Sequence, residues 1–182
     1  MSILETILKA GGGDLVKKVA GNVGMEAGDT SKALAAVMPY LKSAMQDNVK
    51  SEDGLSSFVK ALTSGGHGKY IDNPDEIVNE NGQTDGMAIL GHLFGSKDQG
   101  QAKVAELSEK LDFDTGTLTK LIPMAATMLM GSMSKNSDAL NLNSASSGTS
   151  FLQSGVISFL DKDKDGSVVD DLLGSIASKF LR

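Results

Sequence analysis

Apolar residues recur three or four positions apart along most of residues 1–135, separated by short polar or glycine-rich breaks. This spacing places the apolar side chains of each group on one face of an α-helix. Runs that alternate apolar and polar residues, which are typical of β-strands, are nearly absent. The pattern predicts an all-α, multihelical domain of about seven or eight helices.

Glycine and capping residues predict where the helices of the first half begin and end. We expect the first helix to stop at Gly11–Gly13, because three glycines cost roughly 3 kcal/mol of helix stability. A second short helix should end at Gly24. Thr30 or Ser31 is expected to cap a third and longer helix, and Ser51 the next one.

The second half begins with a segment rich in loop residues, 64–86, which a short helical piece at 75–79 interrupts. Helical spacing resumes at Thr84 or Asp85 and ends at Gly95. Asp114 or Thr115 should then cap the last long helix of the domain.

Two of the expected helices carry the same apolar pattern, 84 positions apart. The matched positions are Leu34, Val37, Met38, Leu41, Ala44 and Met45, and Leu118, Leu121, Ile122, Ala125, Met128 and Leu129. An interior proline is also matched, Pro39 with Pro123. Because helices rarely tolerate proline, we predict two pseudo-repeated halves, each with a kinked helix or two helices meeting at its proline.

Composition changes sharply after residue 135. Residues 136–150 are rich in Ser and Asn and have no apolar period, which predicts a flexible linker. Residues 151–182 contain three of the six Phe and form the expected C-terminal helix–loop–helix tail. The predicted organisation is therefore a domain at 1–135, a linker and a small tail.

Charge and composition exclude several classes of protein. With no cysteine among 182 residues, the chain has no disulfide framework, thiolate zinc site or cysteine nucleophile. A net charge of −6 argues against nucleic-acid binding. The segment MSILETILKA lacks the features of a signal peptide, and the longest apolar stretch, 121–133, is too short and polar to span a bilayer. We therefore expect a cytoplasmic protein without a membrane span.

The nine methionines have two interpretations. They suit an adaptable binding groove, or they fill gaps in a core that has no Trp; we favour the second. Met124 and Met130 lie off the main apolar stripe of their helix, so a paired repeat or another subunit should bury them.

An acidic loop in the tail matches part of an EF-hand calcium loop. Asp161, Asp163 and Asp165 occupy loop positions 1, 3 and 5, Gly166 follows, and Ser167 would offer its carbonyl. Calcium takes six to eight oxygen ligands, and a tightly curled loop offers every second side chain to it. The pattern predicts a calcium site.

The end of this loop departs from the standard pattern. Position 12, normally a bidentate Glu, is Leu172, so the closing carboxylate must come from Asp170 or Asp171. The alternative is a solvated acidic turn in which these two residues cap a helix. The loop carries five Asp and two Lys, a net charge of −3, and such crowding favours a bound cation.

The two histidines are the only candidates for catalysis. His67 lies in a glycine loop near Asp72, and His92 follows Asp85 by seven residues. A hydrolase needs an imidazole beside a carboxylate, yet no hydrolase, metalloprotease or phosphate-binding motif accompanies either histidine. We favour structural roles for both and keep a hydrolase using His67 or His92 as the alternative.

Two motifs carry a resemblance to a known family: Gly65–Tyr70 (GGHGKY) and Asp85–Lys97 (DGMAILGHLFGSK). Together with the Asp-rich loop followed by Asp170–Gly174, they resemble the bacterial YidB-like family of uncharacterised proteins. The resemblance implies a bacterial, multihelical protein and no established activity. We expect a non-enzymatic binding or scaffold protein with a calcium-binding tail; its protein partner and oligomeric state stay open.

Overall fold

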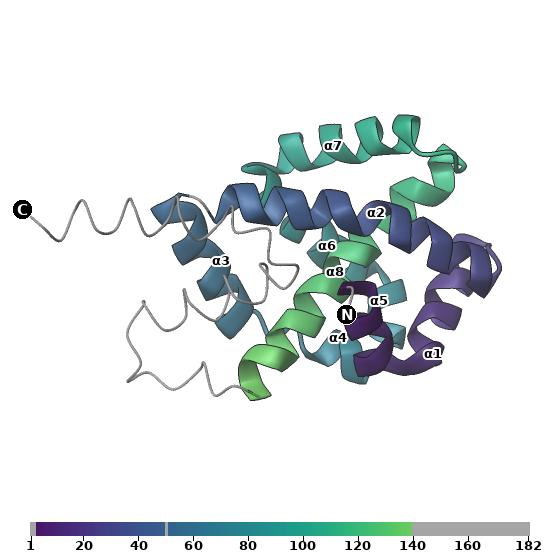
Figure 1. The fold of residues 1–182 in the computed structure, drawn as a ribbon, viewed down its shortest axis with the longest axis horizontal. Helices are drawn as coiled ribbons and strands as arrows, with labels where there is room; N and C mark the ends of the chain where they lie inside the picture. Colours follow the sequence, from purple (N-terminus) through teal and green to yellow (C-terminus); the bar gives the residue numbers. More distant parts are fainter. Residues whose placement is uncertain (1–2, 50, 140–182) are drawn as a thin grey trace, which may run out of the picture.

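The computed structural model describes residues 3–49 and 51–139, and this part of the chain consists of helices and the short connections between them, without a strand (Figure 1). Its helices are α1 (Ile3–Val23), α2 (Ala27–Asn48), α3 (Glu52–Ser64), α4 (Lys69–Asp72), α5 (Asp75–Val78), α6 (Glu80–Phe94), α7 (Lys97–Lys110) and α8 (Thr115–Ala139). The eight helices confirm the prediction of an all-α domain.

The core is built around α8, which contacts each of the other described helices. Every residue from Leu121 to Ser134 is buried, so this helix is enclosed on all sides. A helix buried all round needs apolar or small residues on every face. That requirement explains why Met124 and Met130 lie off the main stripe and yet have almost no exposed surface.

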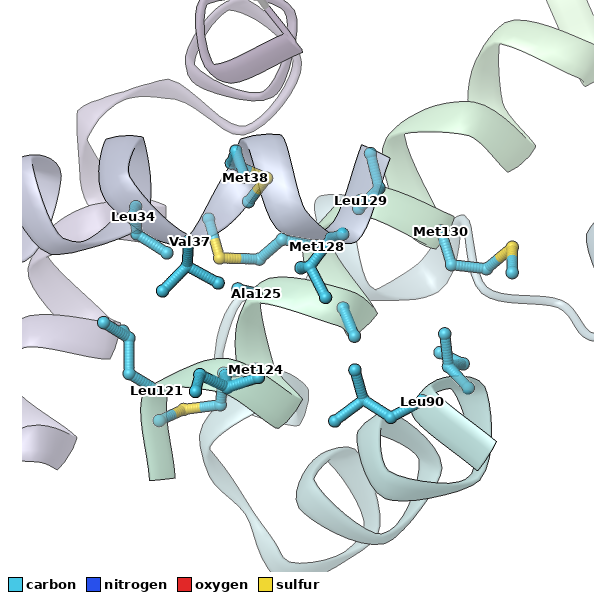
Figure 2. Packing of buried hydrophobic residues seen from close by; sticks show 14 of the residues in the cluster. Leu34, Val37, Met38, Leu90, Leu121, Met124, Ala125, Met128, Leu129 and Met130 are labelled. Atoms are coloured by element: carbon cyan, nitrogen blue, oxygen red, sulfur yellow. The ribbon is translucent and has the colours of Figure 1, made fainter. Parts of the chain in front are cut away.

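The two matched apolar stripes are confirmed as core positions, since all twelve residues are buried. Figure 2 shows Leu34, Val37 and Met38 of α2 facing residues of α8, with Leu90 of α6 on the other side. Six methionines are buried in this cluster, which supports their interpretation as gap-filling residues: Met38, Met45, Met124, Met128, Met130 and Met133. Pro39 is exposed whereas Pro123 is buried, and the pseudo-repeat stays a prediction.

The prediction that Gly11–Gly13 end a helix is wrong, because α1 continues through them to Val23. Leu15, Val16 and Val19 are buried where α1 packs on α2 and α8. Burying an aliphatic side chain contributes about 1.5–3 kcal/mol, so a few such contacts outweigh the roughly 3 kcal/mol lost at three glycines.

The third helix starts earlier than expected and is not divided at its proline. α2 begins at Ala27, and the Thr30 hydroxyl donates to the Glu26 carbonyl at 2.9 Å instead of capping the helix. α2 runs through Pro39 and α8 through Pro123, which excludes two helices meeting at either proline.

Several predicted helix ends are confirmed by their geometry. The Ser51 hydroxyl accepts from the Gly54 N–H at 3.0 Å, and the Asp114 carboxylate accepts from the Thr117 N–H at 2.8 Å. Gly24 and Gly95 follow α1 and α6 with φ of 73° and 95°, the left-handed conformation that favours glycine.

The segment 64–86 contains more helix than its sequence predicted. α5 matches the expected short helical piece, but α4 was not expected. α6 begins at Glu80, four residues before Thr84, because the Asn79 side chain accepts from the Gly82 N–H at 2.9 Å and caps the helix.

At the other end of the domain, α8 extends to Ala139, past the start of the predicted linker. Within the described ranges, no helix has the length and apolar character needed to cross a membrane. The predicted tail, residues 151–182, lies outside the described residues.

Candidate functional site

The short helix α4 places a phenol in the interior of the domain. Tyr70 is completely buried, and its hydroxyl donates a hydrogen bond to the carboxylate of Asp85 on α6. Burial raises the pKa of Tyr70, and the hydrogen bond and negative charge of Asp85 raise it further. The phenol therefore stays protonated and acts as a permanent donor to the carboxylate.

His67 lies beside this pair, in the connection between α3 and α4. Its ring stacks on Tyr70, with centroids 6.2 Å apart and an angle of 22° between the planes. The Nδ1 atom is buried and has no hydrogen-bond partner. Burial lowers the pKa of His67, and this effect exceeds the opposing influence of the Asp85 carboxylate. The imidazole is consequently neutral at pH 7.

Lys69 and Asp72, on the same short helix as Tyr70, make further contacts near it. The Lys69 ammonium lies 4.8 Å from the centroid of the Tyr70 ring, a cation–π contact. The Asp72 carboxylate forms an ion pair with Lys135 of α8. Within the described residues, no hydrogen bond or ion pair joins His67 to either Asp72 or Asp85.

His92 lies about two turns after Asp85 on α6, and its charge adds to the lowering of the His67 pKa. It is exposed on α6, and its backbone carbonyl accepts from the Asn48 side chain of α2 at 2.8 Å. His92 also lines an open cleft of about 700 Å³ between α6 and α7. The described residues that line this cleft are Gln83, Thr84, Met87, Ala88, Gly91, His92, Gly95, Ser96, Lys97 and Gln101.

This cleft has no carboxylate among its described lining residues, and its basic groups are His92 and Lys97. More of its lining is apolar than polar, with Met87, Ala88 and Gly91 contributing from α6. The geometry suits binding of an apolar surface that carries negative charge. It does not provide the imidazole–carboxylate pair that a hydrolase needs.

The sequence offered His67 or His92 with Asp72 or Asp85 as alternatives, and the structure forms no imidazole–carboxylate hydrogen bond from these residues within the described part of the chain, although Asp85 and His92 both influence the pKa of His67. It adds Tyr70, which the sequence analysis named only as the last residue of the motif Gly65–Tyr70. It also adds the cleft, whose walls come from α6 and α7. These two helices are joined at Gly95, where the sequence predicted the end of a helix.

Metal ligation has no candidate in this part of the molecule. Over residues 3–49 and 51–139, no group of three or more His, Asp or Glu side chains is placed to hold a metal ion. The predicted calcium ligands lie outside the described residues: Asp161, Asp163, Asp165, Ser167, Asp170 and Asp171.

Comparison with known proteins gives a family for most of the chain. Residues 5–136 match the family described as "Bacterial protein of unknown function (DUF937)". No curated protein matches the chain, and no solved structure does. The matched region extends from α1 nearly to the end of α8, so it includes the Tyr70–Asp85 pair and the cleft. The chain belongs to this family of bacterial proteins.

Proposed function

We propose that this protein, of the YidB-like type, is a non-enzymatic binding protein whose C-terminal loop binds calcium. The observation that supports a non-enzymatic role is the hydrogen bond from Tyr70 to Asp85. It engages the carboxylate that the hydrolase hypothesis assigned to a histidine, and it leaves the His67 Nδ1 without a partner.

The buried position of Tyr70 supports a structural role for this pair. A phenol with no exposed surface is out of reach of a substrate, so its bond to Asp85 serves to join α4 to α6. A buried hydroxyl needs such a partner, because leaving a polar group unpaired costs about 1–3 kcal/mol.

The cleft between α6 and α7 supports a binding role. It is open, largely apolar and bordered by the cationic Lys97, and its described lining lacks a carboxylate to act as general base. A protein segment with apolar side chains and nearby acidic residues is the complementary ligand.

Calcium binding rests on the spacing of the acidic loop. Asp161, Asp163 and Asp165 alternate as EF-hand ligands do, and Gly166 permits the turn. Without the bidentate Glu at position 12, we expect a dissociation constant of roughly 10⁻⁵ to 10⁻³ M.

Titration calorimetry on the full chain tests the calcium site. We expect one binding event for the wild type and loss of its heat in the double variant Asp161→Asn, Asp163→Asn. The matched control removes two exposed carboxylates of the domain, Glu109→Gln and Asp112→Asn, and should bind calcium as the wild type does. Absence of heat in the wild type, or equal heats in all three proteins, would contradict the proposal.

Hydrolysis of chromogenic carboxylic and phosphoric esters tests the non-enzymatic part. The wild type, His67→Gln and His92→Gln should all give the same background rate. A rate above background that either substitution abolishes would restore the hydrolase hypothesis.

A further inference from the structure

We propose that the cleft between α6 and α7 is occupied by the C-terminal segment of the same chain, residues 151–182, in its calcium-loaded form. This inference rests on the proposed calcium loop, and it names the segment that binds in the cleft. Three properties of the chain support it: the character of the cleft, the composition of the segment, and the distance between the end of α8 and the cleft.

The cleft and the segment are complementary in polarity and charge. The cleft combines an apolar wall, including Met87 and Ala88, with the cation of Lys97. The segment contains apolar residues on both sides of an acidic loop with a net charge of −3. Binding one calcium reduces the charge of the loop to −1 and so weakens its own repulsion. Because Lys179 and Arg182 offset the remaining charge of the segment, its attraction to Lys97 is confined to the loop, and the apolar flanks supply most of the match to the cleft.

The described end of the domain lies within reach of the cleft. Near the end of α8, the Ser134 hydroxyl donates to the Leu62 carbonyl at 3.2 Å, in the last turns of α3. Just before α3 begins, the Asn48 side chain bonds to the His92 carbonyl at 2.8 Å, at the cleft. Ser134 and the cleft are thus separated by about the length of α3, whose 13 residues span roughly 20 Å, and the remaining residues of α8, 135–139, add at most about 8 Å.

The connecting residues are sufficient for this distance. Residues 140–150 reach at most about 36 Å when extended. As a flexible coil of the same length they average about 18 Å between ends. Because the segment is tethered, its effective concentration near the cleft is about millimolar, and a weak contact is enough to hold it there.

Calcium should control this contact. Without metal, the five aspartates of the loop repel one another, which disfavours bringing its two apolar flanks together. When calcium draws the loop together, the flanks present one apolar face, including Phe159 and Ile176, to the cleft. Docking then stabilises the loaded loop, and by reciprocity an intact cleft increases calcium affinity.

A spin label on the tail of the full chain tests the docking. Because the chain has no native cysteine, Ser178→Cys provides a single attachment point for a nitroxide. With calcium present, the label should broaden the amide resonances of Met87, Gly91 and Lys97. The resonances of Lys17 on α1 serve as the reference and should stay sharp.

Two matched substitutions connect the docking to the cleft. Ala88→Glu adds bulk and negative charge inside the cleft, whereas Ala105→Glu makes the same change at an exposed position of α7 outside it. Ala88→Glu should abolish the broadening and weaken the apparent calcium affinity about 5-fold or more, and Ala105→Glu should change neither.

The outcomes separate this inference from the proposed function. Calcium binding without broadening at the cleft, or with equal effects of both substitutions, would overturn the docking and leave the calcium site intact. Broadening that grows with protein concentration would make a second copy the occupant and also overturn it. Absence of calcium binding, with no broadening, would overturn both proposals.

Discussion

Replacing Gly86 with alanine tests the packing at the centre of the fold. Gly86 is buried on α6 where that helix crosses α8. A methyl group at Gly86 would lie 2.2 Å from the Pro123 carbonyl oxygen, 2.6 Å from its carbon and 2.8 Å from the Thr127 hydroxyl oxygen. Two of these atoms belong to the backbone of a helix that is enclosed on all sides, so a rotamer change does not relieve the overlap.

The helices must separate by about 1 Å to admit the methyl group, and a gap of that size forfeits a quarter to a half of each lost contact. Overpacking of this kind costs about 1–3 kcal/mol, and the backbone atoms involved favour the upper part of the range. Alanine recovers about 0.5–1 kcal/mol of helix propensity. We therefore expect Gly86→Ala to lower the free energy of unfolding by about 2 kcal/mol.

Gly21→Ala is the matched control, because a methyl group at this exposed position of α1 meets no atom within 4 Å. It should raise the free energy of unfolding by about 0.5–1 kcal/mol through propensity alone. Urea denaturation followed by circular dichroism measures both variants. A Gly86→Ala protein as stable as the wild type, with Gly21→Ala stabilised as expected, would refute the packing argument.

Two substitutions, Tyr70→Phe and His67→Gln, test the contacts around Asp85. Tyr70→Phe should lower the free energy of unfolding by about 1–3 kcal/mol in urea titrations, since the Asp85 carboxylate loses its donor, whereas Tyr40→Phe at an exposed site should have little effect. His67 should make stability depend on pH, because its folded pKa lies below its unfolded value. The unfolded chain then binds more protons, so the contribution of the neutral imidazole is complete above about pH 6.5 and is lost as pH falls through the folded pKa. Urea titrations at pH 7.5 and pH 5.5 should show this loss in the wild type and a smaller one in His67→Gln; equal losses in the two proteins would contradict the assignment.

Helical periodicity predicted the core of this protein well, because the apolar spacing is repeated over many residues of each helix and no single residue decides it. Leu121 and Leu129 are buried on α8 as their spacing required, and so are their counterparts on α2. The wrong predictions concern residue types, above all glycine, that occur both at the ends of helices and at close contacts inside them. Gly11–Gly13 suggested an end of α1 from local propensity, but packing of the following turns keeps the helix intact.

The start of α6 shows the same ambiguity. Asn81-Gly82 is typical of a turn, yet Gly82 is buried inside the helix, where a methyl group would lie 2.2 Å from the Glu76 carbonyl oxygen. A glycine that allows close approach cannot be distinguished by sequence alone from one that allows a turn. The partner of Asp85 was missed for a related reason, because the choice between Tyr70 and His67 depends on how α4 is rotated against α6.

Equilibrium dialysis of the full chain against calcium tests the central claim most directly. At about 10 mM free calcium, ten times the upper end of the expected dissociation range, the account predicts about 0.9 or more calcium per chain when magnesium is present in equal amount. It predicts no retained calcium for the Asp161→Asn, Asp163→Asn variant. A wild type that retains no calcium, or one that exchanges it fully for magnesium, would contradict the assignment of a calcium-binding tail.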